Sequence, residues 1–183
     1  MSGFEFLFSF YSLLLGLAVA GVATGLADSW RPRAQTGFGS TTSLLGLLVL
    51  LNAARQWLSF WESRDVLTMG PWEVLVCMGM SLPYIFISQA MFPQERGNSI
   101  DFDGYYLQNS RPLLLALLIP PVVSSSYNLA MQGIDWSYAN TYALPLLVPS
   151  VLVFSKRQWL HRIGLTLLVF NVLVLMFAAK PAA

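Results

Sequence analysis

Residues 4–27 read FEFLFSFYSLLLGLAVAGVATGLA, and Glu5 is the only charged side chain among them. A helix needs about 20 mostly apolar residues to cross roughly 30 Å of membrane hydrocarbon, so this segment is long enough to do so. It is also long for the apolar core of a secretory signal. Such a signal requires positive charge before its apolar core, and no Lys or Arg precedes this segment. The segment therefore predicts a retained transmembrane helix.

Five further apolar segments follow along the chain, at residues 41–61, 72–92, 112–132, 138–155 and 163–179. The segment at 138–155 is short for a full span, so a re-entrant helix there stays an alternative. The connections are short, contain turn residues, and are too small to fold as separate domains. The sequence therefore predicts one all-α domain over residues 1–183, a polytopic transmembrane bundle of about six helices.

The composition agrees with a membrane location. Hydrophobic residues make up 56% of the chain and charged residues only 10%, whereas a soluble domain carries about 25% charged residues. The formal net charge of +1 leaves no basic face for nucleic acid, so no nucleic-acid partner is expected. The expected partners are membrane lipids, together with other membrane subunits or further copies of this chain.

The distribution of Lys and Arg predicts the orientation in the membrane, because cytoplasmic loops carry an excess of these residues. The connections after the first, third and fifth segments hold seven of them, and the opposite side holds two. We therefore expect those three connections to be cytoplasmic and both termini to lie outside. The seven are Arg31, Arg33, Arg96, Arg111, Lys156, Arg157 and Arg162, and the two are Arg64 and Lys180.

Three polar residues, Asn52, Arg55 and Gln56, interrupt the second segment. Their spacing of three and four places them on one helix face. An arginine costs about 2.5–3.5 kcal/mol at the membrane centre, and Arg55 lies about 6 Å from it. We expect Glu5 and Glu73 at the same side of the membrane, where either could pair with Arg55. Two interpretations stay open: a site for an ion, proton or substrate, or polar contacts that hold helices together.

The first segment carries two rows of small residues, which let helix backbones approach closely. One row is the GxxxG pair Gly21 and Gly25, and the other is Gly16, Ala20 and Thr24. The rows could pack against other helices of the same chain or form a dimer face. We favour packing within the chain, because such motifs are common in apolar helices.

Prolines interrupt several of the apolar segments. Each removes a backbone donor and frees a carbonyl group, which then needs a new partner inside the membrane. Interrupted helices form the sites of many transporters, but prolines also produce ordinary kinks, and both interpretations stay open. The residues concerned are Pro83, Pro120, Pro121, Pro145 and Pro149, with Ser124, Ser125 and Ser126 directly after the double proline.

The connection between the third and fourth segments contains Asp101 and Asp103. Carboxylates suit hard cations, but the spacing is not that of a calcium-binding helix–loop–helix. Alternatively, Ser99 or Asp101 caps a short interfacial helix that leads into the fourth segment. The single histidine, His161, cannot supply a bis-histidine haem site, and nothing pairs it with the single cysteine, Cys77. No motif for a metal, haem or nucleotide is present, and a bound lipid or pigment stays open.

Scattered points along most of the chain carry a resemblance to known proteins. These are Phe4-Glu5-Phe6 with Phe10, Tyr11 and the Leu-Leu-Gly-Leu of residues 14–17, then Arg64-Asp65, Phe92-Pro93 and residues 101–106. At these points the chain resembles small polytopic inner-membrane proteins of bacteria. The resemblance implies a bacterial inner-membrane location, and it implies no activity and no catalytic residue.

Three functional hypotheses follow from these patterns. The first is a non-enzymatic accessory or structural subunit of a larger membrane complex, which the short connections and small-residue rows favour. The alternative is a small oligomeric transporter or channel with a polar seam around Arg55. The third is an interfacial enzyme that uses Asp101, Asp103 or that seam, and it has the least support because no catalytic motif is present.

Overall fold

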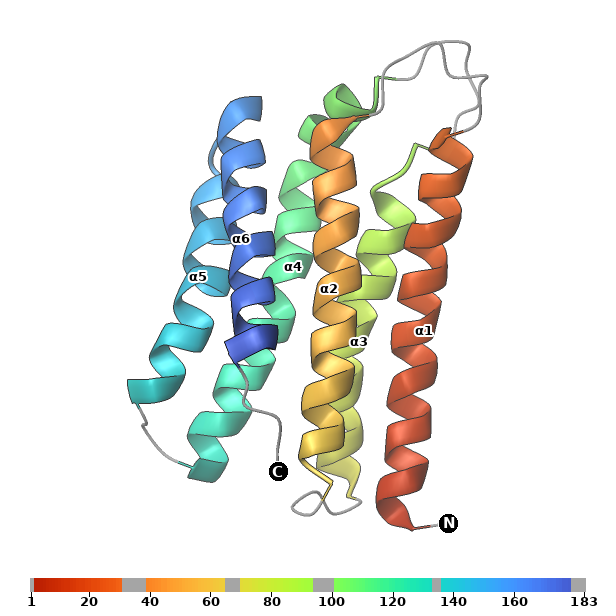
Figure 1. Cartoon of the computed structure of the whole chain (residues 1–183), viewed down its shortest axis with the longest axis vertical. Helices are drawn as coiled ribbons and strands as arrows, with labels where there is room; N and C mark the ends of the chain where they lie inside the picture. Colours follow the sequence, from red (N-terminus) through yellow and green to blue (C-terminus); the bar gives the residue numbers. More distant parts are fainter. Residues whose placement is uncertain (1, 31–38, 65–69, 94–100, 133–135, 179–183) are drawn as a thin grey trace.

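The computed structural model describes residues 2–30, 39–64, 70–93, 101–132 and 136–178, with side chains for all of these except 30 and 131–140. Within these residues all regular structure is helical, which confirms the predicted all-α bundle (Figure 1). Arg31, Arg33, Arg96 and Lys180, which entered the orientation argument, and Ser99, a candidate cap, lie outside the described residues. The six helices are α1 (Gly3–Trp30), α2 (Ser40–Glu62), α3 (Pro71–Ala90), α4 (Phe102–Gln132), α5 (Trp136–Leu152) and α6 (Gln158–Ala178).

The helices run alternately up and down the bundle. In Figure 1, α1 begins and α6 ends at the lower end, whereas α2, α4 and α6 all begin at the upper end. Helix α2 packs against α1, α3, α4 and α6, and α5 lies at the margin, where it contacts α4 and α6. Five of the described helices are long and apolar enough to cross a membrane, and α5 is the exception.

Helix α5 is short but runs from one end of the bundle toward the other. Its 17 residues correspond to about 25 Å at the helical rise of 1.5 Å per residue. It begins at the lower end, and α6 begins at the upper end, so the chain does not turn back at mid-depth (Figure 1). The described residues therefore contain no re-entrant hairpin at the predicted fifth segment.

Helix α4 begins about ten residues earlier than the predicted start at 112. Asp101 caps it, since its Oδ1 accepts a hydrogen bond of 2.9 Å from the amide of Gly104. Phe102, Tyr106 and Ser110, four residues apart, are all buried against the bundle. The residues between them include the polar Asp103, Gln108 and Asn109, of which only Gln108 is exposed. This polar composition is why the stretch resembles a loop in sequence. The cap at Asp101 is present, but the helix that follows is continuous with the span.

The first turn of α1 is held by a reciprocal pair of hydrogen bonds. The amide of Glu5 donates to Ser2 Oγ at 3.2 Å, and the amide of Ser2 donates to Glu5 Oε2 at 2.8 Å. This arrangement satisfies two backbone donors that a helix start otherwise leaves free. Glu5 is therefore engaged at its own helix end.

One face of α1 supplies the core and the opposite face is apolar but exposed. The buried residues Leu7, Tyr11, Leu15, Ala18 and Val22 follow a helical spacing of three and four. Exposed large apolar residues are spread over all six helices, which is expected of a surface that faces lipid rather than water. The length of the helices and their exposed apolar surface are therefore those of a multi-pass helical membrane protein.

The two small-residue rows of α1 face different surroundings. A Cβ atom added at Gly21 would lie 2.6 Å from Ser88 Oγ of α3, and one added at Gly25 would lie 2.2 Å from the ring of Phe92. A Cβ added at Gly16 would meet nothing within 4 Å, and Ala20 and Thr24 of the same row are exposed. The GxxxG pair therefore packs against the chain's own α3 segment, and the second row lies open on the outer surface.

Candidate functional site

A cavity of about 190 Å³ lies among the helices, and its lining joins two groups of residues that the sequence singled out separately. Asn52, Arg55 and Gln56 of α2 form part of it. The prolines of α4 and α5 also face it, and these are Pro120, Pro121, Pro145 and Pro149. Pro83 of α3 is buried and does not line the cavity. The predicted polar seam and four of the five predicted helix interruptions therefore meet at one place.

Among the residues that the structure describes, Arg55 is the only charged one in the lining of this cavity. It is half-buried, and it makes no hydrogen bond or ion pair with the described residues. Neither of the two carboxylates expected beside Arg55 pairs with it. Glu5 is bonded to Ser2, and the side chain of Glu73 folds back over Gly70 at the start of α3. Arg55 thus presents an uncompensated positive charge to the cavity.

Gln56 joins three helices through its side-chain amide. Its Oε1 accepts a hydrogen bond from the hydroxyl of Tyr11 on α1, and its Nε2 donates to the hydroxyl of Tyr84 on α3 at 3.0 Å. Tyr11 and Tyr84 are both fully buried. An amide that is hydrogen-bonded to two neighbouring helices helps to fix how they pack, so Gln56 acts as structural support for the cavity wall.

The facing wall is held by a second hydrogen-bonded group between α4 and α5. The hydroxyl of Tyr142 accepts from Asn128 Nδ2 at 2.7 Å and lies 2.8 Å from Ser124 Oγ. All three residues line the cavity. Pro120 and Pro121 remove two amide donors from α4 just before Ser124, although the helix continues through them. This contact ties that part of α4 to its neighbour α5. The sequence did not single out Tyr142 or Asn128, although each is a polar residue within an apolar segment.

The cavity reaches the end of the bundle where α2 finishes. Its lining runs along α2 from Leu48 through Ser59, which is exposed, to Ser63, which terminates the helix. Fifteen residues of helix correspond to roughly 22 Å, so the lining extends to about the middle of the membrane. In Figure 1 the end of α2 lies at the lower end of the bundle, where α1 begins.

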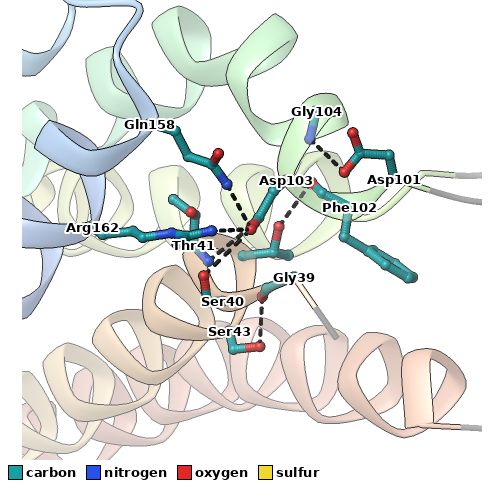
Figure 2. Close-up of polar contacts among 11 residues, drawn as sticks. Gly39, Ser40, Thr41, Ser43, Asp101, Phe102, Asp103, Gly104, Gln158 and Arg162 are labelled. Carbon is teal, nitrogen blue, oxygen red and sulfur yellow. Dashed lines mark hydrogen bonds and ion pairs between the residues drawn. The ribbon is translucent and has the colours of Figure 1, made fainter. Parts of the chain in front are cut away.

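The opposite end of the bundle is closed by a cluster of polar contacts centred on Asp103 of α4 (Figure 2). Its Oδ1 accepts from the amide of Thr41 at 2.9 Å, and its Oδ2 accepts from Ser40 Oγ at 3.3 Å. The same Oδ2 accepts from Gln158 Nε2 at 2.8 Å and Arg162 Nη2 at 3.0 Å. Asp103 therefore connects α4 to α2 and α6.

This cluster has an electrostatic cause in the topology. Because α2, α4 and α6 all begin at this end, their positive dipole ends converge there, and a carboxylate is favoured beside them. Gly39, the residue before α2, has no side chain to cap that helix. Asp103 supplies the missing acceptor from another helix, 62 residues along the chain. With its oxygens so occupied, Asp103 is a structural acceptor.

His161 lies inside α6 and is fully buried, not in a connection as the sequence indicated. Its Nδ1 lies 3.0 Å from the hydroxyl of Tyr106, and its Nε2 lies 3.0 Å from the carbonyl oxygen of Ser155. A carbonyl only accepts, so Nε2 donates to Ser155. The ring fastens α6 to α4 and to the turn after α5, a role that the Lys and Arg residues around it in the sequence do not indicate.

The remaining described residues that could take part in chemistry do not line the cavity. Cys77 is buried in α3, and no group of three His, Cys, Asp or Glu side chains that could hold a metal exists within the described ranges. Comparison with known proteins found no matching family model, no matching curated protein and no matching solved structure. The functional argument therefore rests on the residues of this chain.

Proposed function

We propose that this multi-pass membrane protein is a small transporter, and that its substrate occupies the cavity around Arg55. The observation that carries the proposal is the convergence, on a single cavity, of an arginine without a partner among the described residues and four prolines that lie inside α4 and α5. Charged residues within a membrane protein mark substrate pathways by default. Prolines in the helices beside the cavity leave backbone carbonyl groups without their usual amide donor, and such groups can contact a substrate.

The two ends of the bundle differ in a way that suits transport. One end is reached past Ser59 and Ser63, whereas the Asp103 cluster ties the helices together at the other end of the bundle. By the excess of Lys and Arg, we propose that the Asp103 end is cytoplasmic and that both termini lie outside. The cavity would then open outward, with the inner end closed.

The test is uptake into proteoliposomes with one anion, one cation and one neutral solute: benzenesulfonate, choline and glycerol. A matched pair of variants controls for folding. Ser124→Phe places a ring in the cavity, while Ser126→Phe places it on the exposed face of the same helix. We expect uptake of at least one solute that Ser126→Phe retains and Ser124→Phe loses. Uptake of none of the three above the Ser124→Phe background would refute transport through this cavity.

An accessory role is the second candidate, and a separate observation favours it. The row of Gly16, Ala20 and Thr24 lies open on the outer face of α1, and small residues let another helix approach closely. The test is a pull-down in mild detergent from native membranes. A partner at fixed stoichiometry that is lost with Gly16→Leu would support the accessory role, and recovery of the chain alone would count against it.

A further inference from the structure

We infer that the ligand of the Arg55 cavity is a small organic monocarboxylate with an apolar body. This inference rests on the proposed function, because it names the class of molecule that the same cavity would hold. Three features support it: the charge of the cavity, the charge balance between a guanidinium group and its anion, and the size of the cavity.

The charge of the cavity favours an anion over a cation or a neutral molecule. Arg55 lines the cavity without a carboxylate beside it, and the other polar lining residues are neutral. Removing a charged group from water is costly unless an opposite charge accompanies it. An anionic ligand supplies that charge, whereas a cation would add a second positive charge to the same enclosed space.

The charge balance favours a carboxylate over a phosphate. A guanidinium group presents two parallel N–H donors that match either anion. A phosphate monoester carries about −1.5 to −2 charges at pH 7, so a single arginine would leave it partly uncompensated. A carboxylate carries one negative charge, and its pairing with Arg55 leaves the cavity neutral. The hydroxyl of Tyr84, in the same lining, offers an additional polar contact.

The remaining lining and the volume define the rest of the ligand. Leu48, Met80, Leu117, Leu168 and Val172 form apolar walls. An apolar cavity of about 150 Å³ binds benzene, so about 190 Å³ suits a ligand with roughly eight non-hydrogen atoms. Benzoate and hexanoate are close to this size, and each joins one carboxylate to an apolar body.

The test is isothermal titration of the full-length protein in nanodiscs of neutral lipid, with benzoate and hexanoate as probes. Their amides, benzamide and hexanamide, are neutral controls of nearly the same shape. We expect both carboxylates to bind at least about tenfold more tightly than their amides, because the charge-assisted pair to Arg55 is lost with the amide. Phenyl phosphate is expected to bind more weakly than benzoate.

Three variants assign the effect to Arg55. Arg55→Gln should weaken carboxylate binding by about tenfold to a hundredfold and leave amide binding unchanged. Arg55→Lys should restore part of the affinity, because it keeps the charge but not the two-pronged geometry. Arg111→Gln removes an exposed arginine of α4 that does not line the cavity, so it should change neither ligand's affinity.

Each contrary result has a defined meaning. Equal binding of carboxylates and amides, lost with Ser124→Phe, would refute the ligand class and leave the transporter proposal standing. Absence of binding by every probe would refute the ligand class, and the uptake assay would then decide the transporter proposal separately. Loss of benzoate binding when phosphatidylglycerol is added to the nanodiscs would overturn the carboxylate assignment in favour of a lipid headgroup at Arg55.

Discussion

Replacing Asp103 with alanine should lower the free energy of unfolding by about 2–4 kcal/mol. The largest part comes from the amide of Thr41, which is fully buried and would lose its acceptor, at about 1–3 kcal/mol. The ion pair to Arg162 adds less than about 1 kcal/mol, because the Arg162 side chain is 48% exposed. The bond from Gln158 would be lost as well, and the bond from Ser40 is long and exposed.

Two further variants separate these contributions. Asp103→Asn keeps an oxygen that can accept from Thr41, so it should cost about half as much as Asp103→Ala. Arg162→Gln removes only the exposed ion pair and should cost under about 1 kcal/mol. Asp101→Ala is the matched control, since it removes a cap at the start of the same helix and should cost about 1 kcal/mol.

The measurement is equilibrium unfolding in mixed micelles, in which SDS is titrated against a mild detergent and helix content is followed by circular dichroism. The order expected is Asp103→Ala most destabilised, then Asp103→Asn, with Asp101→Ala and Arg162→Gln mildest. If Asp103→Ala were no more destabilised than Asp101→Ala, the idea that one carboxylate links three helix starts would be wrong.

Three more predictions concern packing, the buried histidine and orientation. Gly21→Leu should cost about 1–3 kcal/mol by overpacking against α3, while Gly16→Leu should leave the unfolding of the isolated chain unchanged in the same titration. His161→Phe should cost about 2–4 kcal/mol, because the buried hydroxyl of Tyr106 and the partly buried carbonyl of Ser155 lose their hydrogen bonds, and a smaller change than Asp101→Ala would contradict this. In intact cells, a membrane-impermeant thiol reagent should label Ser63→Cys and spare Ser155→Cys, and the reverse pattern would invert the proposed orientation.

The sequence predicted the helices well because their signal is local. Long apolar runs determine a membrane helix by composition alone, and five of the described helices meet that criterion. The start of α4 was predicted too late because its first turns contain several polar residues. Phe102, Tyr106 and Ser110 nevertheless recur at a spacing of four, so a search for one buried face would have extended the helix.

The contacts of Asp103 and His161 were not predictable in the same way. The acceptor for Thr41 lies 62 residues away, and the partner of His161 lies 55 residues away. Neither pairing has a local sequence signature, because each depends on which helices are neighbours and how they are rotated. The structure does not show the expected pairing of Arg55 with Glu5 or Glu73, because a shared side of the membrane does not by itself bring two side chains together.

The site itself was predicted as parts, but its assembly was not. Sequence spacing placed Arg55, Asn52 and Gln56 on one helix face and marked the prolines as helix interruptions. Only the packing shows that these groups face one another and that Gln56 is turned toward Tyr11 and Tyr84 as support. Within the seam, Gln56 is therefore a structural contact, Asn52 donates to the carbonyl of Leu48 in its own helix, and Arg55 has no hydrogen-bond or ion-pair partner among the described residues.

The arrangement of charge along the bundle indicates the end at which a substrate would enter in the proposed transport. At one end, Asp103 lies beside the positive dipole ends of α2, α4 and α6 and ties these helices together. Toward the other end, Arg55 has no such partner, and the cavity beside it reaches the bundle surface. An anion drawn to Arg55 would therefore enter from the open end. To leave at the other side, it would require the Asp103 contacts to separate, so Asp103→Asn should accelerate exchange through the protein while leaving carboxylate affinity at Arg55 unchanged. Slower exchange in that variant, with folding intact, would exclude Asp103 as the closing contact.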